Sequence, residues 1–467
     1  MDDLGQCPGS CLHAKHAAMT TTQVAFFYLR DLIGFFLGAF VQDTSWQEWD
    51  LSGIDDPVKD IFRAKTDEGS NMIKGYEELK RSPCTIHKIQ RSVGKFTKHK
   101  AIDPVFAKGR GTVGYFNSST IGNSDLMKCC KEAGVSTTNL IQDMPVRWGT
   151  THDMCNSMRE KMQPMLIYDI KYGGPKAAKS FLANRYTTEE WSINNQSVAA
   201  LQPPRAVTVL LQADAYPTSN IVLPCIYGVI AATDPRVAVP LPWAPHEMIQ
   251  PDDLRPEVAA ARQAMHEDFK HIWIDELPEQ ELLFMLTCTL CDPRNIAMVF
   301  PLVTDELRST ATAAFIAEYL LNWAPAEDVN ENVENAMEPE EIASETSQEL
   351  AIIQPRNLSS FSDFLASVEH VTTQPATKKS QAEEYLDMIP EPKDTDILVW
   401  WGQNEHRFPE LARMAAQFLG CPASSASAER IFSLAGRLYD KLTSNMSDGK
   451  LEERMFAKLN RGKRDSK

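Results

Sequence analysis

Asp67 is the first residue of this sequence whose type and setting could do chemistry. It ends a short strand-like run that begins at Phe62, and a turn over residues 68–71 follows it. A helix with apolar periodicity is then predicted from Met72 to Leu79. A carboxylate at a strand end can hold Mg²⁺, which prefers oxygen ligands. The same side chain could instead cap the helix, and alone the cap is the simpler interpretation.

Three cysteine patterns have the spacing of metal ligands. Cys84 and His87 are three residues apart, but a closed zinc site needs four ligands and no matching second pair is found. Cys288 and Cys291 follow an apolar run, which favours two small core residues. The cysteines and histidines of residues 7–16 lack the spacer that lets a zinc finger fold around its metal. We therefore expect no zinc site.

Basic residues are concentrated between Lys74 and Arg110, with ten Lys or Arg against three acids. By contrast, residues 327–349 hold nine acids and no Lys or Arg, which favours a solvated acidic linker. The whole chain has a net charge of −16, so any contact with nucleic acid must come from a local patch. The basic stretch could be such a patch or simply a solvated face. Its predicted DNA-contacting residues are Lys88, Arg91, Lys95 and Lys98.

The elements that must position these groups are mostly helical. A chain of 467 residues with 43% apolar residues predicts two to four globular domains. Apolar residues recur every three or four positions over 258–272, after Pro256, which suits a first helical turn. The same spacing follows Pro409 until Gly420 and Pro422 interrupt the pattern. The most apolar stretch, 24–41, contains Arg30 and Asp31, which argues against a membrane span. We expect a protein of the nucleus or cytoplasm, without a signal peptide and without a membrane partner.

The C-terminal part of the sequence carries a motif of aromatic residues and serines. A tryptophan pair, Trp400 and Trp401, precedes the run Arg407-Phe408-Pro409-Glu410-Leu411. The sequence Ser-Ser-Ala-Ser-Ala-Glu-Arg-Ile-Phe-Ser-Leu-Ala-Gly then occupies residues 424–436. In this order the motif resembles the dimerisation segment of hAT-superfamily DNA transposases. Further hAT-like motifs occur upstream in the expected order, at residues 66–72, 84–87, 143–151, 216–227 and 291–294. The resemblance extends from about residue 55 to the end.

The resemblance implies an RNase H-like α/β core, interrupted by a large helical insertion and completed by C-terminal helices. In this family two aspartates and one glutamate hold two divalent ions for phosphodiester transfer. By position, Asp67 would be the second carboxylate and Glu429 the third. Glu429 could instead be a first-turn acid that complements a helix dipole. Mg²⁺ or Mn²⁺ is expected only if that catalytic site functions, and otherwise we expect no cofactor.

The sequence departs from the family at two places. Residues 1–60 contain no match to the first catalytic Asp motif, and no BED-type zinc finger precedes the core. Loss of one carboxylate removes a bridge between the two ions. We therefore predict a domesticated, catalytically inactive transposase that dimerises and could bind DNA. The alternatives are an active DNA transposase that uses an unrecognised first Asp, and a helical scaffold with no role in nucleic-acid binding.

The same resemblance assigns the residues of self-association. A homodimer or larger assembly is the expected partner, and DNA is the possible second partner. Trp148 corresponds to a tryptophan that the family places near the DNA end, but it could instead stack on Arg147 in the interior. The aromatic and apolar C-terminal residues could lie in a core within one chain or between two chains. The predicted dimerisation residues are Trp400, Trp401, Phe408, Pro409, Leu411 and Phe432.

These inferences give a fold class of α/β plus all-α, with an incomplete RNase H-like core. The predicted organisation has five parts. They are an N-terminal segment of unclear fold (1–54), a partial RNase H-like core (55–150), an all-helical insertion (151–323), an acidic linker (324–395) and the hAT C-terminal dimerisation region (396–467).

Overall fold

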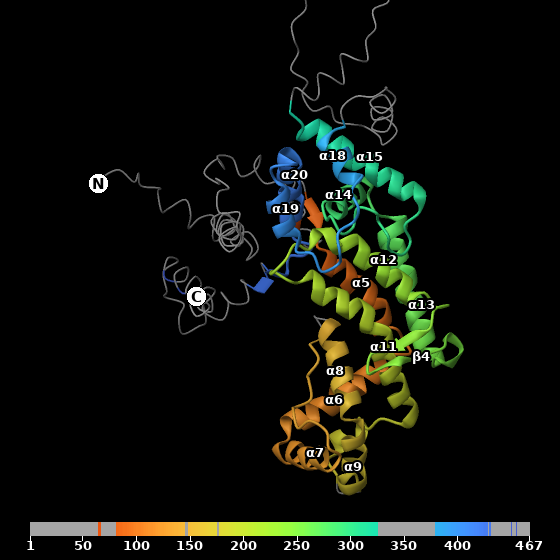
Figure 1. The fold of residues 1–467 in the computed structure, drawn as a ribbon. Coiled ribbons are helices and arrows are strands. Elements are labelled where there is room, and N and C mark those ends of the chain that lie inside the picture. The colour runs from red at the N-terminus through yellow and green to blue at the C-terminus, as the bar shows by residue number, and fades with distance from the viewer. Residues whose placement is uncertain are drawn as a thin grey trace, which may run out of the picture.

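Helices make up most of the chain that the structure describes. The computed structural model describes residues 64–66 (backbone only), 81–144, 148–174, 177–325, 379–427, 429–430, 450 and 454. Within these ranges the helices run along one elongated body, from α7 and α9 at its lower end to α18, α19 and α20 at its upper end (Figure 1). The fold is mostly α-helical with a small amount of sheet.

The lower end of the body is built from five helices. Tyr115, Phe116, Tyr168 and Phe181 pack there, with the rings of Phe116 and Tyr168 5.0 Å apart and nearly perpendicular. This edge-to-face arrangement suits the charge distribution of aromatic rings. The helices are α6 (Asp103–Ser118), α7 (Thr120–Glu132), α8 (Trp148–Glu160), α9 (Met162–Tyr172) and α10 (Lys179–Ala183).

The middle of the body surrounds one helix, α5 (Thr85–Thr97), which packs against α8, α11 and α13. The longest of these, α11 (Thr188–Leu211), begins with a capping box in which Thr187 and Glu190 satisfy each other's backbone N–H groups. The other central elements are η1 (Ser219–Ile221), α12 (Val222–Thr233), η2 (Pro251–Asp253), α13 (Pro256–Lys270) and the π-helical turn η3 (His271–Asp275).

The upper end joins two distant segments of the sequence. Helices α14 (Glu279–Leu290) and α15 (Asp305–Asn322) pack with α18 (Gln381–Leu386), α19 (Ile397–Asn404) and α20 (Pro409–Gly420). The buried hydroxyl of Tyr385 donates to the carbonyl of Leu290 at 2.8 Å. The C-terminal helices therefore share a hydrophobic core with the helical body.

The sheet in the described residues consists of two pairs of strands. Strands β1 (Ala64–Thr66) and β2 (Arg81–Pro83) are parallel, and Ala64 is in register with Arg81. Strands β3 (Val239–Leu241) and β4 (Ala244–Ile249) form an antiparallel hairpin. The hairpin lies within the segment that we expected to be all-helical. Two parallel strands do not define an RNase H-like core. The described residues therefore show a mostly α-helical fold with a small amount of sheet, and the expected RNase H-like core stays a prediction.

Two helices predicted from periodicity are confirmed. Helix α13 begins at Pro256, and the apolar positions of its predicted face, from Val258 to Phe269, are buried. Helix α20 begins at Pro409 and ends at Gly420, with Leu411 and Phe418 among its buried residues. Proline at a first helical position suits its fixed φ, and its missing N–H leaves no hydrogen bond unmade. In the described part of the chain, each helix is too short or too polar to cross a membrane.

Candidate nucleic-acid interface

Helix α5 and its C-cap residue Lys98 carry the basic residues that were predicted to contact DNA. Its apolar residues Ile86, Ile89, Val93 and Phe96 follow helical spacing and are buried. The opposite positions carry polar and basic side chains. Since α8, α11 and α13 cover the apolar side, only the basic side of α5 reaches solvent.

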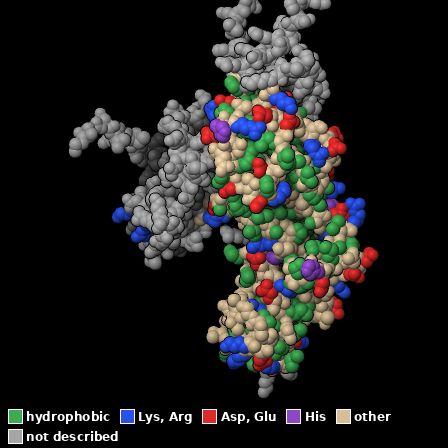
Figure 2. All heavy atoms as spheres, in the orientation of Figure 1, with side chains coloured by type: hydrophobic (Ala, Val, Ile, Leu, Met, Phe, Trp, Pro, Cys, Tyr) green, Lys and Arg blue, Asp and Glu red, His purple; other side chains and the backbone are tan. Residues whose placement is uncertain are grey.

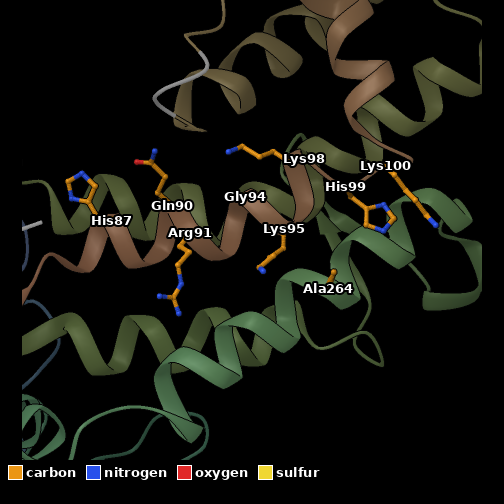
Figure 3. Close-up of a pocket in the computed structure, with 9 residues that line it drawn as sticks. All are labelled: His87, Gln90, Arg91, Gly94, Lys95, Lys98, His99, Lys100 and Ala264. Atoms are coloured by element: carbon orange, nitrogen blue, oxygen red, sulfur yellow. The ribbon is translucent and has the colours of Figure 1, made fainter. Parts of the chain in front are cut away.

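The basic side of α5 lines an open hollow of about 780 Å³, which we call the α5 hollow. Figure 3 shows Arg91 and Lys95 extending from one side of the helix and Gln90 and Lys98 from the other. None of the described residues that line the hollow is an aspartate or glutamate. The lining residues are His87, Gln90, Arg91, Gly94, Lys95, Lys98, His99, Lys100 and Ala264.

A carboxylate at the border of the hollow partly neutralises it. The Nζ atom of Lys95 lies 3.4 Å from Asp268 on α13, and Asp268 also accepts a hydrogen bond from Ser92 at 2.8 Å. Lys95 is half-exposed while Asp268 is largely buried. The pair therefore fixes α5 to α13 and leaves Lys95 with less charge to offer a ligand than its type suggests.

Of the four basic residues predicted to contact DNA, the structure exposes three and buries one. Arg91, Lys95 and Lys98 are exposed in the hollow. Lys88 is buried, with its ammonium 4.9 Å from the centre of the Trp273 ring, a cation–π arrangement. This placement removes Lys88 from the predicted contact set. The reason is helical geometry, because Lys88 shares a helix face with Thr85, three positions before it, and Ser92, four positions after it, and both are buried.

Sequence reasoning missed two histidines and a lysine in the hollow, together with Gly94. His99 and Lys100 follow the end of α5 and lie at one end of the hollow. His87 was noted only as a metal-ligand candidate. The spacing 87, 90, 91, 94, 95 and 98, which is one face of a helix, would have found His87 and Gly94 but not His99 and Lys100.

Cys84 and His87 lie at the start of α5, beside the C-terminal region. The backbone N–H of Ser425 donates to Cys84 Sγ at 3.4 Å, and the N–H of Thr85 donates to the Ala423 carbonyl at 3.2 Å. Burial raises the pKa of the Cys84 thiol, but hydrogen bonds with His87 and Ser425 outweigh burial and lower the pKa from 9.0 to about 7. The hydrogen bond from Ser425 therefore holds the C-terminal region against the start of α5, and it favours the thiolate form of Cys84.

Glu429, the expected third metal-binding carboxylate, lies close to this cluster. Its Oε1 atom accepts a hydrogen bond of 3.0 Å from Ser425 Oγ and lies 3.9 Å from Nε2 of His87. The side chain is half-exposed. Asp67 lies outside the described residues, so the expected pair of carboxylates is not seen together. Within the described part, His, Cys, Asp and Glu side chains form no group of three that could hold a metal ion.

Four of the five predicted dimerisation residues that the structure describes lie in the chain's own core. Trp401, Phe408 and Leu411 are fully buried, and Trp400 is nearly so. The two indoles pack edge to face at 4.9 Å, and the ring of Tyr385 lies 5.3 Å from that of Trp401. The fifth, Pro409, begins α20 and is exposed. The four buried residues therefore hold α18–α20 on the body of their own chain.

The predicted dimerisation residue Phe432 and the predicted DNA contact Trp148 are not tested by the described side chains. Phe432 is outside the described residues. Trp148 begins α8, but its side chain is not described, and neither is Arg147. The predicted DNA contact of Trp148 and its alternative stacking on Arg147 therefore stay predictions.

Cys288 and Cys291 are buried small residues of the core, as the apolar run before them predicted. The Asp292 that follows them is also fully buried. It accepts hydrogen bonds from Arg294 at 2.9 and 2.8 Å and from Asn220 at 2.7 Å. Since Arg294 in turn donates to the carbonyls of Lys393 and Thr395, this network also ties α14 to the approach to α19.

Comparison with known families identifies the C-terminal part of the chain. Residues 381–460 match the hAT family C-terminal dimerisation region. The chain carries this region and is homologous to plant zinc finger BED domain-containing proteins, so the expected family resemblance is confirmed.

Three relatives show how far the similarity extends. The zinc finger BED domain-containing protein DAYSLEEPER of Arabidopsis thaliana is 29% identical over 118 residues, which are 23% of this chain and 17% of that protein. RICESLEEPER 2 of Oryza sativa subsp. japonica, of the same description, is 37% identical over 95 residues, or 19% and 13% of the two chains. RICESLEEPER 3 of the same plant is 23% identical over 304 residues, or 63% and 35%. The chain thus matches about a third of these relatives' length or less.

Proposed function

We propose that this protein self-associates through its hAT C-terminal region and binds DNA with the basic face of α5. The observation that carries the DNA-binding part is the α5 hollow, in which Arg91, Lys95 and Lys98 gather with no carboxylate among the described lining residues. Such a surface attracts phosphate groups and concentrates them even when the whole chain is acidic. The relatives named for a BED-type zinc finger support a chromatin-associated role and a nuclear location.

We further propose that the protein does not catalyse phosphodiester transfer. Support comes from the sequence, in which residues 1–60 lack the family's first Asp motif. The proposed inherited pair, Asp67 and Glu429, would hold Mg²⁺ or Mn²⁺ only in the alternative, an active transposase. An incomplete RNase H-like core remains our proposal for the ancestry of the segment around β1 and β2. In that case the segment would retain the fold of the ancestral core but not the pair of metal ions that phosphodiester transfer needs.

Fluorescence anisotropy with a labelled duplex tests DNA binding directly. We expect binding at low salt that weakens steeply as salt rises, because cations on the DNA are released. Lys98→Glu should weaken binding strongly, while Lys131→Glu on α7, far from the hollow, should leave it unchanged (Figure 1). Absence of any binding at low salt would reject the DNA-binding role.

Light scattering tests self-association, and a nicking assay on supercoiled DNA with Mn²⁺ tests catalysis. We expect a mass above that of one chain and no nicking. A monomer at all concentrations would contradict the first part. Nicking that Asp67→Asn and Glu429→Gln both abolish would establish the active-transposase alternative.

A further inference from the structure

Gly94 lies in the middle of α5, on the side that faces the hollow. Glycine in a helix interior is less stable than alanine because it loses more backbone freedom on folding. Here no internal contact requires it. A Cβ atom added at Gly94 would meet no atom of the described residues within 4 Å. The position is therefore one where alanine would fit the fold and favour the helix.

The neighbours of Gly94 on that helix face are polar or cationic. Residues three and four positions apart share a face, so Gln90, Arg91 and Lys98 surround Gly94. Figure 3 shows Gly94 between the two rows of side chains that rise from α5. The floor of the hollow is thus bare helix backbone, and its rim can donate hydrogen bonds and positive charge.

We infer that Gly94 is the floor of a subsite for a backbone phosphate of DNA, and that recognition there does not depend on base sequence. This inference rests on the proposed DNA binding. It adds the position of one bound phosphate, directly over Gly94. The absent side chain lets the phosphodiester approach the helix closely enough for Arg91 and Lys98 to reach it from either side. Along the helix, Arg91 lies about 4.5 Å before Gly94 and Lys98 about 6 Å after it, so both long side chains can reach one phosphate over Gly94.

The ligand of this subsite gives the reason that base sequence is not read there. Arg91 and Lys98 carry positive charge toward a phosphate group, which is the same at every position of the DNA backbone. Helices α8, α11 and α13 cover the inner side of α5, so its exposed side makes the contact. Contacts to phosphate fix position and orientation and carry no direct sequence information.

The experiment compares Gly94→Ala with Gly228→Ala in the full-length protein. Gly228 lies inside α12, and a Cβ added there likewise meets no described atom within 4 Å. Both variants should raise the melting temperature. Only Gly94→Ala should weaken binding of a labelled duplex, by about tenfold, because the new methyl occupies the phosphate position. Two duplexes of equal length and unrelated sequence should bind equally to the wild-type protein.

The outcomes separate this inference from the proposed function. If Lys98→Glu weakens DNA binding but Gly94→Ala does not, the protein binds DNA and the phosphate subsite is wrong. If the wild-type protein binds no duplex at low salt, both fail. A strong preference between the two duplexes would overturn recognition through the backbone. Inorganic phosphate is the second probe, and stabilisation by phosphate that Gly94→Ala abolishes, without any DNA binding, would assign the hollow to a free anion instead.

Discussion

The indole N–H of Trp401 donates a hydrogen bond of 2.9 Å to the backbone carbonyl of Cys291, 110 residues earlier in the chain. Both residues are fully buried. The bond joins α19, in the hAT C-terminal region, to the end of α14 in the helical body. Deleting residues 396–467 would therefore expose a core as well as remove a dimerisation region, so point variants are the better test of self-association.

Trp401→Ala should lower the free energy of unfolding by about 3–5 kcal/mol, because it leaves a large cavity and an unpaired carbonyl. Urea denaturation followed by circular dichroism measures this change. Val399→Ala, half-exposed on the same helix, is the control and should change stability by less than about 0.5 kcal/mol. Similar losses in both variants would contradict the packing of α19 described here.

Asp292→Asn should cost about 1.5–3 kcal/mol of stability, because it removes the charge of a fully buried carboxylate that accepts hydrogen bonds from the partly buried guanidinium of Arg294. The matched control is Glu384→Gln, which breaks the exposed ion pair with Arg407 and should cost about 0.2–1 kcal/mol. Urea titrations of both variants give the comparison. Equal costs would mean that the Asp292 network is not buried in solution.

Salt dependence distinguishes exposed from buried lysines of α5. Lys98→Gln should reduce the slope of log K against log salt concentration by about 0.9, the value for one phosphate contact. Lys88→Gln should leave that slope unchanged and lower stability instead, because its ammonium packs on Trp273. Anisotropy titrations over a range of salt concentrations measure both. A fall in slope for Lys88→Gln would show that this lysine faces DNA after all.

The Cys84 thiol should titrate near pH 7, which ultraviolet difference absorbance between the wild-type protein and Cys84→Ala can follow. Its folded-state pKa is below the ordinary value of 9.0, so the unfolded chain binds the proton more tightly. The stability that Cys84 contributes is then fully present above about pH 9 and is lost as pH falls through about 7. The stability difference between the two proteins should therefore grow from pH 7 to 9, by roughly 2 kcal/mol. A difference that does not vary with pH would contradict the thiolate.

Self-association should depend on exposed apolar side chains of the hAT region. Ile389 and Val399 are 87% and 50% exposed, although both lie in or beside helices of that region. We expect the double variant Ile389→Glu and Val399→Glu to lower the mass measured by light scattering. Val209→Glu, at 53% exposure on α11, is the control and should not. An unchanged mass in the double variant would place the contact elsewhere, with Phe432→Glu as the next variant.

The mixed distribution of charged side chains on the surface explains why the overall charge of the chain does not predict DNA binding. Figure 2 shows acidic, basic and apolar side chains mixed over the visible face of the described residues. A net charge of −16 therefore coexists with a local basic surface. Counting charges between Lys74 and Arg110 located the stretch, but it treated residues on both sides of α5 alike, and so included Lys88.

The sequence by itself determined several elements and the family. Apolar spacing and the prolines at positions 256 and 409 placed α13 and α20, because helix periodicity and proline geometry are local properties. The C-terminal motif identified the hAT region, whose match covers residues 381–460. The motif also marked Trp400, Trp401 and Phe408 as core residues, while leaving open whether that core belongs to one chain or two.

Only the tertiary structure decided which surfaces are covered. It placed the C-terminal aromatics against α14 and α15 of the same chain, turned Lys88 toward Trp273, and left Gly94 in the open. Periodicity shows which residues share a helix face, but it does not show which neighbour covers that face. That choice depends on contacts between residues more than a hundred positions apart, such as Trp401 with Cys291, and these are set by the packing of the whole chain.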